Sequence, residues 1–329
     1  MLAEYIWLDA DNNFRSKIRV IELNNNANWN FDGSSTGQAT TESSEVILKV
    51  VYNVNHPFLD GRLYLCATYD INNKPLPNNF YDIAYDIFNK KLDLKPWFGL
   101  EQEYFIYDKN LIINSPDVKP SIGQTLVITD NNTFYCSPIN QDQDEVKISL
   151  EHLEACIKAG INVSGNNAEV VQHQWEFQVG PVIGIKAGHQ LMVARYLLNR
   201  IAAKYNKIVN YHPKPIAGVN GSGCHINFST KSMRDENGLD IIMNAIEMLN
   251  NNHAYHMENY GEDNQMRMTG HNETSSYSTF SWGVGSRNTS VRIGYDTFKN
   301  KKGYFEDRRP ASNINPYLAT SIIFQTCCL

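Results

Sequence analysis

The chain has 329 residues, of which 42% are hydrophobic and 19% charged, so it can form one large domain or two. Its formal net charge of −6 argues against a general nucleic-acid binder or a protein held on anionic membranes. No apolar run approaches the roughly 18 residues of a membrane-spanning helix, and the first residues lack the basic region of a signal peptide. Six scattered cysteines without a C-x-x-C pair predict reduced thiols in a cytoplasmic protein.

The first 79 residues are expected to form mainly β-structure. Four stretches have the composition of strands, at residues 5–8, 18–21, 45–54 and 63–68, and the first two flank a polar turn as in a hairpin. Residues 29–37 are rich in Gly and Ser, and we expect a loop in which two aromatic residues anchor an aspartate and three hydroxyl groups. The proline-containing run at 74–79 predicts a domain boundary, with domains at 1–79 and 80–329.

Apolar residues at helical spacing predict four helices in the second part, over residues 80–89, 149–159, 188–205 and 236–260. In the second of these, Leu150, Leu153 and Ile157 share the apolar face, and Gly160 ends the helix. The third is apolar on a broad face, which indicates burial. Residues 108–143 are polar and predict irregular structure.

An acidic strand is the centre of the chemical interpretation. In residues 97–107 the aromatic and β-branched residues favour a strand, on which Glu101 and Glu103 share one face. Two neighbouring carboxylates in so apolar a strand repel each other and lose hydration, and a divalent cation between them would remove both costs. An edge strand with two solvated glutamates is the simpler interpretation of this stretch alone.

Three further stretches repeat the pattern of a polar face on an apolar strand. Gln174, Glu176 and Gln178 alternate with large apolar residues, shortly after Glu169 in the run 167–170. His225, Asn227 and Ser229 share a face after a glycine-rich turn, which would let another group approach the backbone closely. Near the end, Glu306 and Arg308 share a face. Taken singly, a strand histidine is more often structural, and a charged run is more often a solvated turn.

Together these stretches supply five glutamates and one histidine on polar strand faces: Glu101, Glu103, Glu169, Glu176, His225 and Glu306. Carboxylates with a single imidazole favour Mg²⁺ or Mn²⁺ over structural Zn²⁺. Arginines 267, 287, 292, 308 and 309 lie in the same C-terminal third. A carboxylate-held divalent metal with clustered guanidinium groups is typical of phosphoryl transfer. Because no Walker A or dinucleotide glycine motif is present, a nucleotide would have to bind on the sheet through metal.

These motifs resemble those of the glutamine synthetases of the eukaryotic-type group, in order and over nearly the whole chain. The matching segments are residues 29–36, 96–104, 167–169, 174–181, 221–231, 269–275 and 302–310. The resemblance implies an α+β protein with a small N-terminal β-grasp domain and a C-terminal α/β catalytic domain, whose curved antiparallel sheet forms a half-barrel. It also implies that ATP phosphorylates the γ-carboxylate of L-glutamate, and that ammonia then displaces phosphate to give L-glutamine.

The resemblance also assigns site residues. Glu103, Glu169 and Glu176 match one metal site, and Glu101, His225 and Glu306 match a second, with two or three Mg²⁺ or Mn²⁺ ions expected per site. Asp32 and Ser35 match the ammonium-site loop, and Glu273 matches a flap carboxylate that closes over the intermediate. Arg267 and Arg308, helped by Asn220 and Gly221, match the clamp for glutamate. The ATP-side positions are Trp97, Glu176, Asn227, Ser229, Tyr304, Arg287 and Arg292; Arg287 also counts as substrate-binding and Arg292 as catalytic.

The resemblance implies a homo-oligomer of five-membered rings, stacked as a decamer. This chain starts almost at its first strand, and residues 108–135 do not match the family's Gly/Pro-rich segment near the contact between rings, so pentamer and decamer both stay open. Residues 215–219 also lack a tryptophan and one residue that the family has before Asn220.

Two alternatives remain: a γ-glutamyl ligase for a larger amine, which the intact Asp32 loop argues against, and a non-catalytic structural relative, which the complete set of six ligand positions argues against.

Overall fold

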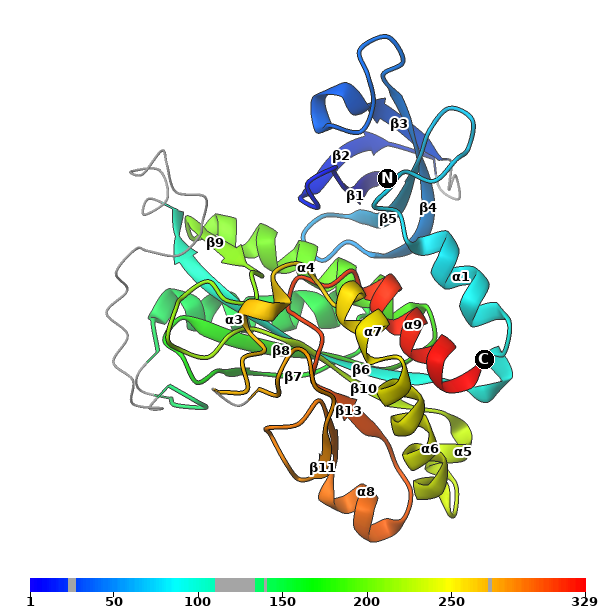
Figure 1. The fold of residues 1–329 in the computed structure, drawn as a ribbon. Helices are drawn as coiled ribbons and strands as arrows, with labels where there is room; N and C mark the ends of the chain where they lie inside the picture. Colours follow the sequence, from blue (N-terminus) through cyan, green and yellow to red (C-terminus); the bar gives the residue numbers. More distant parts are fainter. Residues whose placement is uncertain (23–27, 110–133, 139–140, 272–273) are drawn as a thin grey trace.

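Two β-sheets form the framework of the protein (Figure 1), seen in a computed structural model that describes residues 1–22, 28–109, 134–138, 141–271 and 274–329. The smaller, N-terminal sheet has the strand order β2-β1-β5-β4-β3. Its strands are β1 (Leu2–Leu8), β2 (Phe14–Val20), β3 (Trp29–Asp32), β4 (Glu45–Asn55) and β5 (Gly61–Tyr69). The β1–β2 hairpin and the strands at β4 and β5 confirm the prediction from sequence.

The stretch 29–37 differs from the loop expected there. Its first four residues form β3, which pairs with β4, and Gly33–Thr36 form the short 3-10 helix η1. The aromatic side chains explain the difference, because Phe31 packs 4.5 Å from Trp7 and Trp29 packs 5.3 Å from Tyr5, measured between ring centroids. Burial of these rings holds the chain extended despite its Gly- and Ser-rich composition.

The larger sheet has the order β11-β12-β13-β10-β6-β8-β7, with β9 also paired to β6. Its strands are β6 (Trp97–Asp108), β7 (Val163–Ala168), β8 (Gln174–Ile183), β9 (Lys207–Asn210), β10 (Cys224–Ser229), β11 (Trp282–Val284), β12 (Val291–Ile293) and β13 (Phe305–Asp307). All pairings are antiparallel except β11 with β12. The sheet curls into a half-barrel, and the protein is α+β, as predicted.

The helices lie mostly around the larger sheet (Figure 1). They are α1 (Tyr81–Asn89), α3 (Gln143–Ala159), α4 (Lys186–Lys204), α5 (Lys231–Arg234), α6 (Gly238–Asn251), α7 (His253–Asn259), α8 (Tyr295–Asn300) and α9 (Pro316–Cys328), with 3-10 turns η2 (Leu92–Leu94) and η3 (Asn264–Met266). No helix in the described parts of the chain combines the length and apolar character needed to cross a bilayer. All six cysteines are free, which confirms the predicted thiols.

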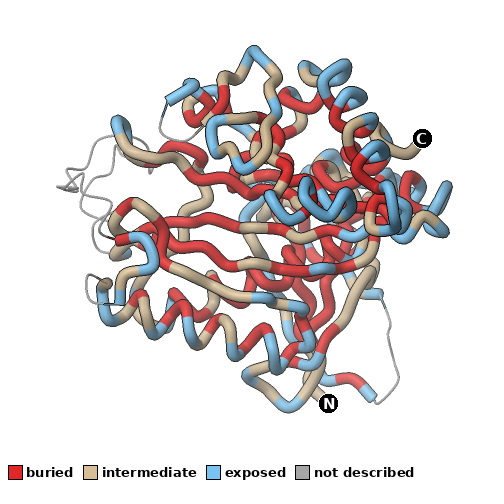
Figure 2. Tube along the Cα trace, turned by 90° about the horizontal axis from the view of Figure 1, so that it is seen from below, coloured by how far each residue is buried: buried red, intermediate tan, exposed pale blue. Residues whose placement is uncertain are grey.

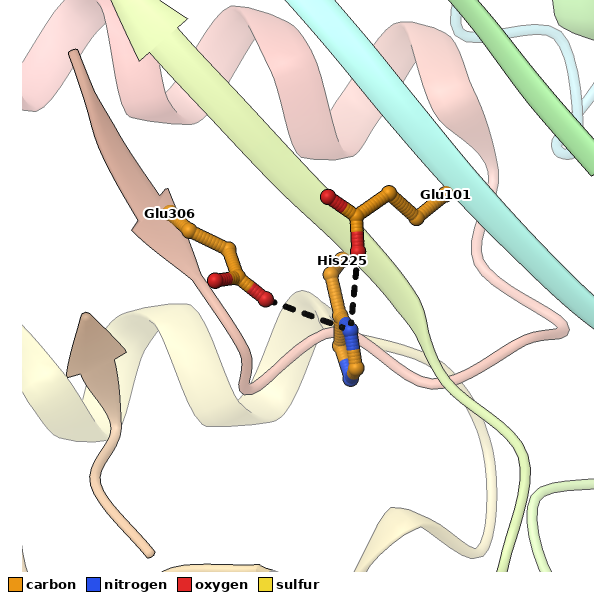
Figure 3. A group of neighbouring side chains, drawn as sticks. All are labelled: Glu101, His225 and Glu306. Atoms are coloured by element: carbon orange, nitrogen blue, oxygen red, sulfur yellow. Dashed lines mark ion pairs between the residues drawn. The ribbon is translucent and has the colours of Figure 1, made fainter. Parts of the chain in front are cut away.

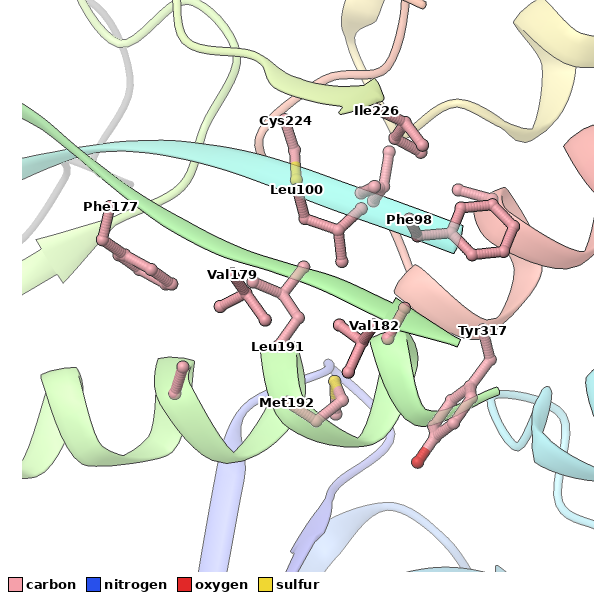
Figure 4. Packing of buried hydrophobic residues seen from close by; sticks show 14 of the residues in the cluster. Phe98, Leu100, Phe177, Val179, Val182, Leu191, Met192, Cys224, Ile226 and Tyr317 are labelled. Atoms are coloured by element: carbon pink, nitrogen blue, oxygen red, sulfur yellow. The ribbon is translucent and has the colours of Figure 1, made fainter. Parts of the chain in front are cut away.

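The main core lies between one face of the large sheet and the buried helix α4. Leu191 and Met192 of α4 pack under Val179 and Val182 of β8 (Figure 4), and α4 is buried along most of its length, as predicted. Figure 2 shows the strands of the large sheet buried over most of their length, whereas the helices expose one side. Gln102 points toward this core, where its Oε1 accepts a 2.8 Å hydrogen bond from Nε of Arg195. Its neighbours on β6 therefore point to the opposite, polar face.

The predicted helix at 149–159 is longer than expected and is buried on another face. It begins at Gln143 because Asp142 caps it, accepting hydrogen bonds from the amides of Asp144 and Glu145. Leu150 and Ile157 are exposed, whereas the buried face includes Ile148, His152 and Ala155. This face packs on α4, so its contacts with that helix decide which side of α3 is buried.

The helix predicted at 236–260 is two helices. The backbone of Asn252 leaves the helical region, with φ −109° and ψ 18°, and its side-chain amide donates to the Met248 carbonyl at 2.8 Å. That bond satisfies a carbonyl at the end of α6, and α7 then starts at His253.

A buried polar contact ties the N-terminal sheet to α4. The Glu4 carboxylate of β1 accepts a 2.6 Å hydrogen bond from the Tyr196 hydroxyl, lies 2.6 Å from Nε2 of His56 and pairs with Arg200. Burial alone would raise the pKa of Glu4, but these partners outweigh it and lower the pKa to about 2. The small sheet is thus fixed against α4 by a buried carboxylate with three partners.

Candidate active site

The acidic face of β6 continues across its neighbours because of the strand register. Glu103 lies opposite Glu176 of β8, and Glu101 lies opposite His225 of β10. Asn227, two residues beyond His225, lies opposite Glu306 of β13. Alternation along four adjacent strands therefore brings side chains from distant parts of the sequence onto one face of the sheet.

The six predicted metal ligands form two groups of three. In each group one ligand atom per residue lies within 4.8 Å of the others, with Glu103, Glu169 and Glu176 in one and Glu101, His225 and Glu306 in the other. Figure 3 shows the second group, in which Nδ1 of His225 lies 3.5 Å from Glu101 and 3.4 Å from Glu306. The structure thus brings together all six residues in the pairing expected from the resemblance.

The electrostatics of the first group favour a bound cation. Burial, followed by the neighbouring Glu169, raises the pKa of Glu103 to about 8. Burial and the carboxylates of Glu101, Glu103 and Glu169 raise the pKa of Glu176 to about 9. The set contains oxygen donors from three carboxylates, which suits Mg²⁺ or Mn²⁺. A divalent cation would offset the repulsion that raises these pKa values.

The second group provides an imidazole that stays neutral. Burial and then Arg308 hold the pKa of His225 well below its usual value, so its ring nitrogen can act as a ligand. Glu306 is engaged by cations of the protein, with Nε of Arg292 at 2.5 Å and a guanidinium nitrogen of Arg308 at 2.7 Å. The same carboxylate thus faces both a candidate metal position and two arginines.

Five of these six residues, all but Glu306, line one cavity of about 230 Å³, which four arginines also line: Arg267, Arg287, Arg292 and Arg308. Arg267 is almost fully buried, and its guanidinium donates to the carbonyls of Arg308, Arg309 and Pro310 at 3.0, 2.7 and 3.2 Å. Burial lowers its pKa to about 10, so it keeps its positive charge at neutral pH. The cavity therefore combines several carboxylates with a fixed positive charge at Arg267.

The glycine-rich turn before β10 allows the close approach to the backbone that its sequence predicts. Asn220 and Gly221 line the cavity, and a Cβ on Gly221 would lie 2.4 Å from the Pro213 carbonyl and 2.5 Å from Cγ of Arg267. Gly223 donates its amide hydrogen to Glu103 at 2.7 Å. Only glycine fits these close approaches, so the turn can pack between the acidic strand and the buried arginine.

A second cavity, of about 420 Å³, lies next to the first. The predicted ATP-side residues Trp97, Asn227, Ser229 and Tyr304 line it, and Glu101 is shared between the two cavities. Trp97 and Tyr304 are exposed, and Arg234 lies with its guanidinium carbon 4.0 Å from the centre of the Trp97 ring. The cavity is mainly apolar. Phe98, Leu100 and Phe228, on the strands β6 and β10 beneath it, are fully buried and belong to the core on the other side of the sheet.

Asp32 and Ser35 lie elsewhere, in the N-terminal sheet and η1. Neither lines the two cavities. Asp32 is exposed and accepts hydrogen bonds from the amide and hydroxyl of Ser34 at 3.0 and 2.6 Å, which lower its pKa. It is therefore a carboxylate at the surface of the small domain. Glu273 falls outside the described residues.

The sequence analysis placed Gln174 and Gln178 on the polar face of their strand but gave them no role. Gln174 lines the first cavity, where its Nε2 donates to the Gly221 carbonyl at 3.0 Å, and Gln178 lines the second. Tyr135 and Thr274, in the first cavity, and Arg234, in the second, were not assigned to a cavity. The approach of Arg234 to Trp97 leaves no signal in the sequence.

Comparisons with known proteins agree with this site. Residues 85–245 match the family described as "Glutamine synthetase, catalytic domain". A protein of Acanthamoeba polyphaga mimivirus, named provisionally as a glutamine synthetase, is 48% identical, with 99% of this chain and 94% of the relative aligned.

Plant relatives are nearly as similar. A cytosolic glutamine synthetase isozyme of Daucus carota is 46% identical over all of this chain and 95% of its own length, and a chloroplastic glutamine synthetase of Brassica napus is 45% identical over all of this chain and 78% of its own. The chain therefore belongs to the glutamine synthetase family, in its eukaryotic-type group.

Proposed function

We infer that this protein is a glutamate–ammonia ligase, which uses ATP to join ammonia to L-glutamate and releases L-glutamine, ADP and phosphate. The observation that carries this inference is the first cavity, where two groups of metal-ligand type and four arginines lie together. A carboxylate is a poor electrophile, and phosphorylation converts one of its oxygens into a leaving group. A site for that step needs cations on the transferred group and a fixed grip on the acceptor.

Two or three Mg²⁺ or Mn²⁺ ions would be held by Glu103, Glu169 and Glu176 on one side and by Glu101, His225 and Glu306 on the other. When bound, they neutralise charge on the phosphoryl oxygens and orient the γ-phosphate. Glu101 lines both cavities, so the second group lies where the nucleotide cavity meets the substrate cavity. The aromatic and apolar lining of the second cavity, with Trp97, Asn227, Ser229 and Tyr304, suits the base and ribose of ATP.

The arginines of the cavity are proposed to bind different parts of the substrates. Arg267 is held by three backbone carbonyls and its side-chain stem packs against Gly221, so this region is the proposed grip on glutamate. Arg287 and Arg292 also line the cavity and would bind phosphate oxygens, with Arg292 acting on the group in transfer. Glu273 is proposed to close over the acyl phosphate and exclude water.

At neutral pH ammonia is largely protonated to the cation NH₄⁺, so the site must bind NH₄⁺ and then remove a proton from it. Asp32 is the proposed group, with Ser35 beside it, because its lowered pKa keeps it anionic. It is exposed on the N-terminal sheet and outside the cavity of its own subunit. We therefore propose that it completes the site of a neighbouring subunit in a head-to-tail ring of five, the arrangement in which one surface of each subunit meets a different surface of the next.

Two further assignments are proposed, the location of the protein and its domain boundary. The cytosolic isozymes among the plant relatives support a cytosolic location. Domains at 1–79 and 80–329 fit the two separate hydrophobic clusters, although Ile6, Val54, Leu63 and Leu65 of the small sheet also pack into the larger cluster.

The test is ATP hydrolysis coupled to a detection system for ADP, with glutamate, ammonium and Mg²⁺ or Mn²⁺ omitted in turn. We expect glutamine formation only when all are present, and ADP release only with glutamate and metal, more slowly when ammonium is omitted. Ethylamine or putrescine in place of ammonium tests the alternative of a larger amine, and a faster rate with either would replace the proposed function by that one. Folded protein without any of these activities would support the non-catalytic alternative.

A further inference from the structure

A buried glutamine at the start of β8 contacts both the first metal group and the glycine-rich turn. Gln174 lines the first cavity and is only 2% exposed. Its amide nitrogen, Nε2, lies 3.0 Å from the Gly221 carbonyl, 3.1 Å from Oγ of Ser222 and 3.4 Å from a carboxylate oxygen of Glu103. One amino group thus approaches three acceptors, which come from two other parts of the chain.

These partners fix which way the side-chain amide of Gln174 points. The Gly221 carbonyl accepts hydrogen bonds and cannot donate them, so the amino group of Gln174 faces it and the amide oxygen faces away. That oxygen, Oε1, is buried and has no hydrogen-bond partner among the described residues. An unpaired buried acceptor costs free energy, and an amide kept at this cost points to a function of its amino group.

The contact with Glu103 concerns one oxygen of the Glu103 carboxylate. Oε2 of Glu103 accepts a 2.7 Å hydrogen bond from the amide of Gly223, and Nε2 of Gln174 approaches the same atom. Two donors that converge on one oxygen hold the plane of the carboxylate and leave its other oxygen, Oε1, available to a cation. The side chain of Gln174 therefore influences how Glu103 faces the first metal group.

The backbone of Gln174 places the other two glutamates of the same group. Its carbonyl accepts a 2.8 Å hydrogen bond from the amide of Glu169, and its own amide donates to the Val171 carbonyl at 3.0 Å, which closes the turn between β7 and β8. Glu176 follows two residues later, on the same face of β8. All three glutamates are therefore tied to Gln174, one through its side chain and two through its backbone.

The contact with Gly221 connects this metal group to the proposed grip on glutamate. Gly221 packs on Arg267 so closely that a Cβ on the glycine would lie 2.5 Å from Cγ of the arginine. The backbone of Gly221 is thus held between the stem of Arg267 and the amide of Gln174. A shift of that amide would move the backbone of the turn as well as the carboxylate of Glu103.

We propose that Gln174 is a positioning residue, whose amino group aligns Glu103 for a metal ion and Gly221 for glutamate. Because Gln174 does not line the second cavity, it should have no effect on the binding of ATP. The part of the proposal that concerns glutamate rests on the ligase function proposed above. The part that concerns the metal ion depends only on the carboxylate group itself.

The test replaces Gln174 by methionine, which keeps the length of the side chain and the backbone contacts but removes the amide. Mn²⁺ binding to the metal-free protein is measured by electron paramagnetic resonance, and KM for each substrate by steady-state kinetics. We expect one Mn²⁺ ion to bind about tenfold more weakly, because loss of a group that orients a ligand typically has this effect. KM for glutamate should rise several-fold, and KM for ATP should equal that of wild type.

Gln190→Met is the matched control. Gln190 of α4 is 5% exposed, and its Oε1 accepts a 2.9 Å hydrogen bond from the amide of Asn162. It lines neither of the two cavities. The control substitution therefore removes an equally buried amide away from the site, and it should leave Mn²⁺ binding and both KM values unchanged in the folded protein.

A double-mutant cycle with Glu103→Gln separates alignment of the carboxylate from a general effect on the fold. If Gln174 acts through Glu103, adding Gln174→Met to Glu103→Gln should weaken Mn²⁺ binding little further, whereas the effects of two independent changes would multiply. Wild-type Mn²⁺ affinity or wild-type KM for glutamate in Gln174→Met, or effects that multiply, would overturn the proposal. Failure of the ligase function is distinguishable, because wild type would then form no glutamine while the Mn²⁺ measurements would still apply.

Discussion

Glu103 and Glu176 lie directly opposite each other on β6 and β8, with both carboxyl groups nearly buried. Like charges at such a cross-strand position destabilise a sheet, and the folded chain responds by holding protons at pKa values of about 8 and 9. This pairing of carboxyl groups destabilises the fold of the metal-free protein, and a bound cation would remove the repulsion. This contrast is the physical basis of the metal assignment.

Stability of the metal-free protein should therefore fall as the pH rises. Both glutamates have a folded pKa above the ordinary 4.5, so the folded state binds more protons than the unfolded state between that value and about 9. Their contribution is complete below pH 4.5 and is lost as pH rises through 8 and 9. We expect the melting temperature in EDTA to drop between pH 6.5 and pH 9.

Mg²⁺ or Mn²⁺ should remove most of that drop, because the cation takes the place of the protons. Glu176→Gln in EDTA should also be more stable than wild type at pH 9, by on the order of a few kcal/mol. A wild-type melting temperature with the same pH dependence in EDTA and in Mn²⁺ would show that the two carboxylates bind no metal.

Loss of a ligand should abolish turnover without unfolding the protein. We expect Glu176→Ala and Glu306→Ala each to lower glutamine formation by more than about a hundredfold at saturating Mg²⁺. Glu145→Ala is the contrasting variant: its buried carboxylate contacts His173 and Trp175 at 2.5 and 3.0 Å, away from the cavity. That change should lower the melting temperature and keep the rate per folded molecule. Near wild-type turnover of either ligand variant would remove that residue from the metal site.

Asp32 is expected to act after the phosphoryl transfer. Asp32→Ala should raise the apparent KM for ammonium and strongly lower glutamine formation, because the NH₄⁺ site loses its anion. Formation of the acyl phosphate, measured as γ-glutamyl hydroxamate or as pyroglutamate, should change much less. Ser34, whose hydroxyl donates to Asp32 at 2.6 Å, offers the control Ser34→Ala with an intact carboxylate. Equal losses in the two reactions would mean that Asp32 only shapes its loop.

A site shared between subunits can be tested by mixing two inactive variants. Asp32→Ala damages the half of the site that the small domain supplies, and Glu306→Ala damages the half on the large sheet. Rings refolded from equal amounts should regain about a quarter of the sites, since both intact halves meet with that probability. The variants refolded separately should stay inactive. Mixed rings with no recovered activity would show that each site lies within one subunit.

Much of the fold and of the site could be predicted from sequence because both depend on the alternation of side chains between the two faces of a strand. The spacing of Glu101 from Glu103, and of Glu176 from its apolar neighbours, fixes which face each residue occupies, whatever the rest of the chain does. Strand register then brings Glu306 next to His225, and here only the family resemblance indicated which distant residues would meet.

The errors came where packing overrides local composition. Phe31 and Trp29 hold residues 29–32 in a strand although their composition is typical of a loop, and packing on α4 decides which face of α3 is buried. Neither partner is visible from the local sequence. The contact of Arg234 with Trp97 was missed for the same reason, since it joins two segments whose spacing carries no pattern.

The most direct test of the account follows one oxygen atom. With L-glutamate labelled with ¹⁸O in the γ-carboxylate, the enzyme is incubated with ATP, ammonium and Mg²⁺, and the released phosphate is analysed by mass spectrometry. Because the γ-carboxylate is phosphorylated and ammonia then displaces that oxygen, we predict one ¹⁸O atom in phosphate for each glutamine formed. Glutamine formed with unlabelled phosphate would contradict the assignment of this carboxylate- and arginine-lined cavity to phosphoryl transfer.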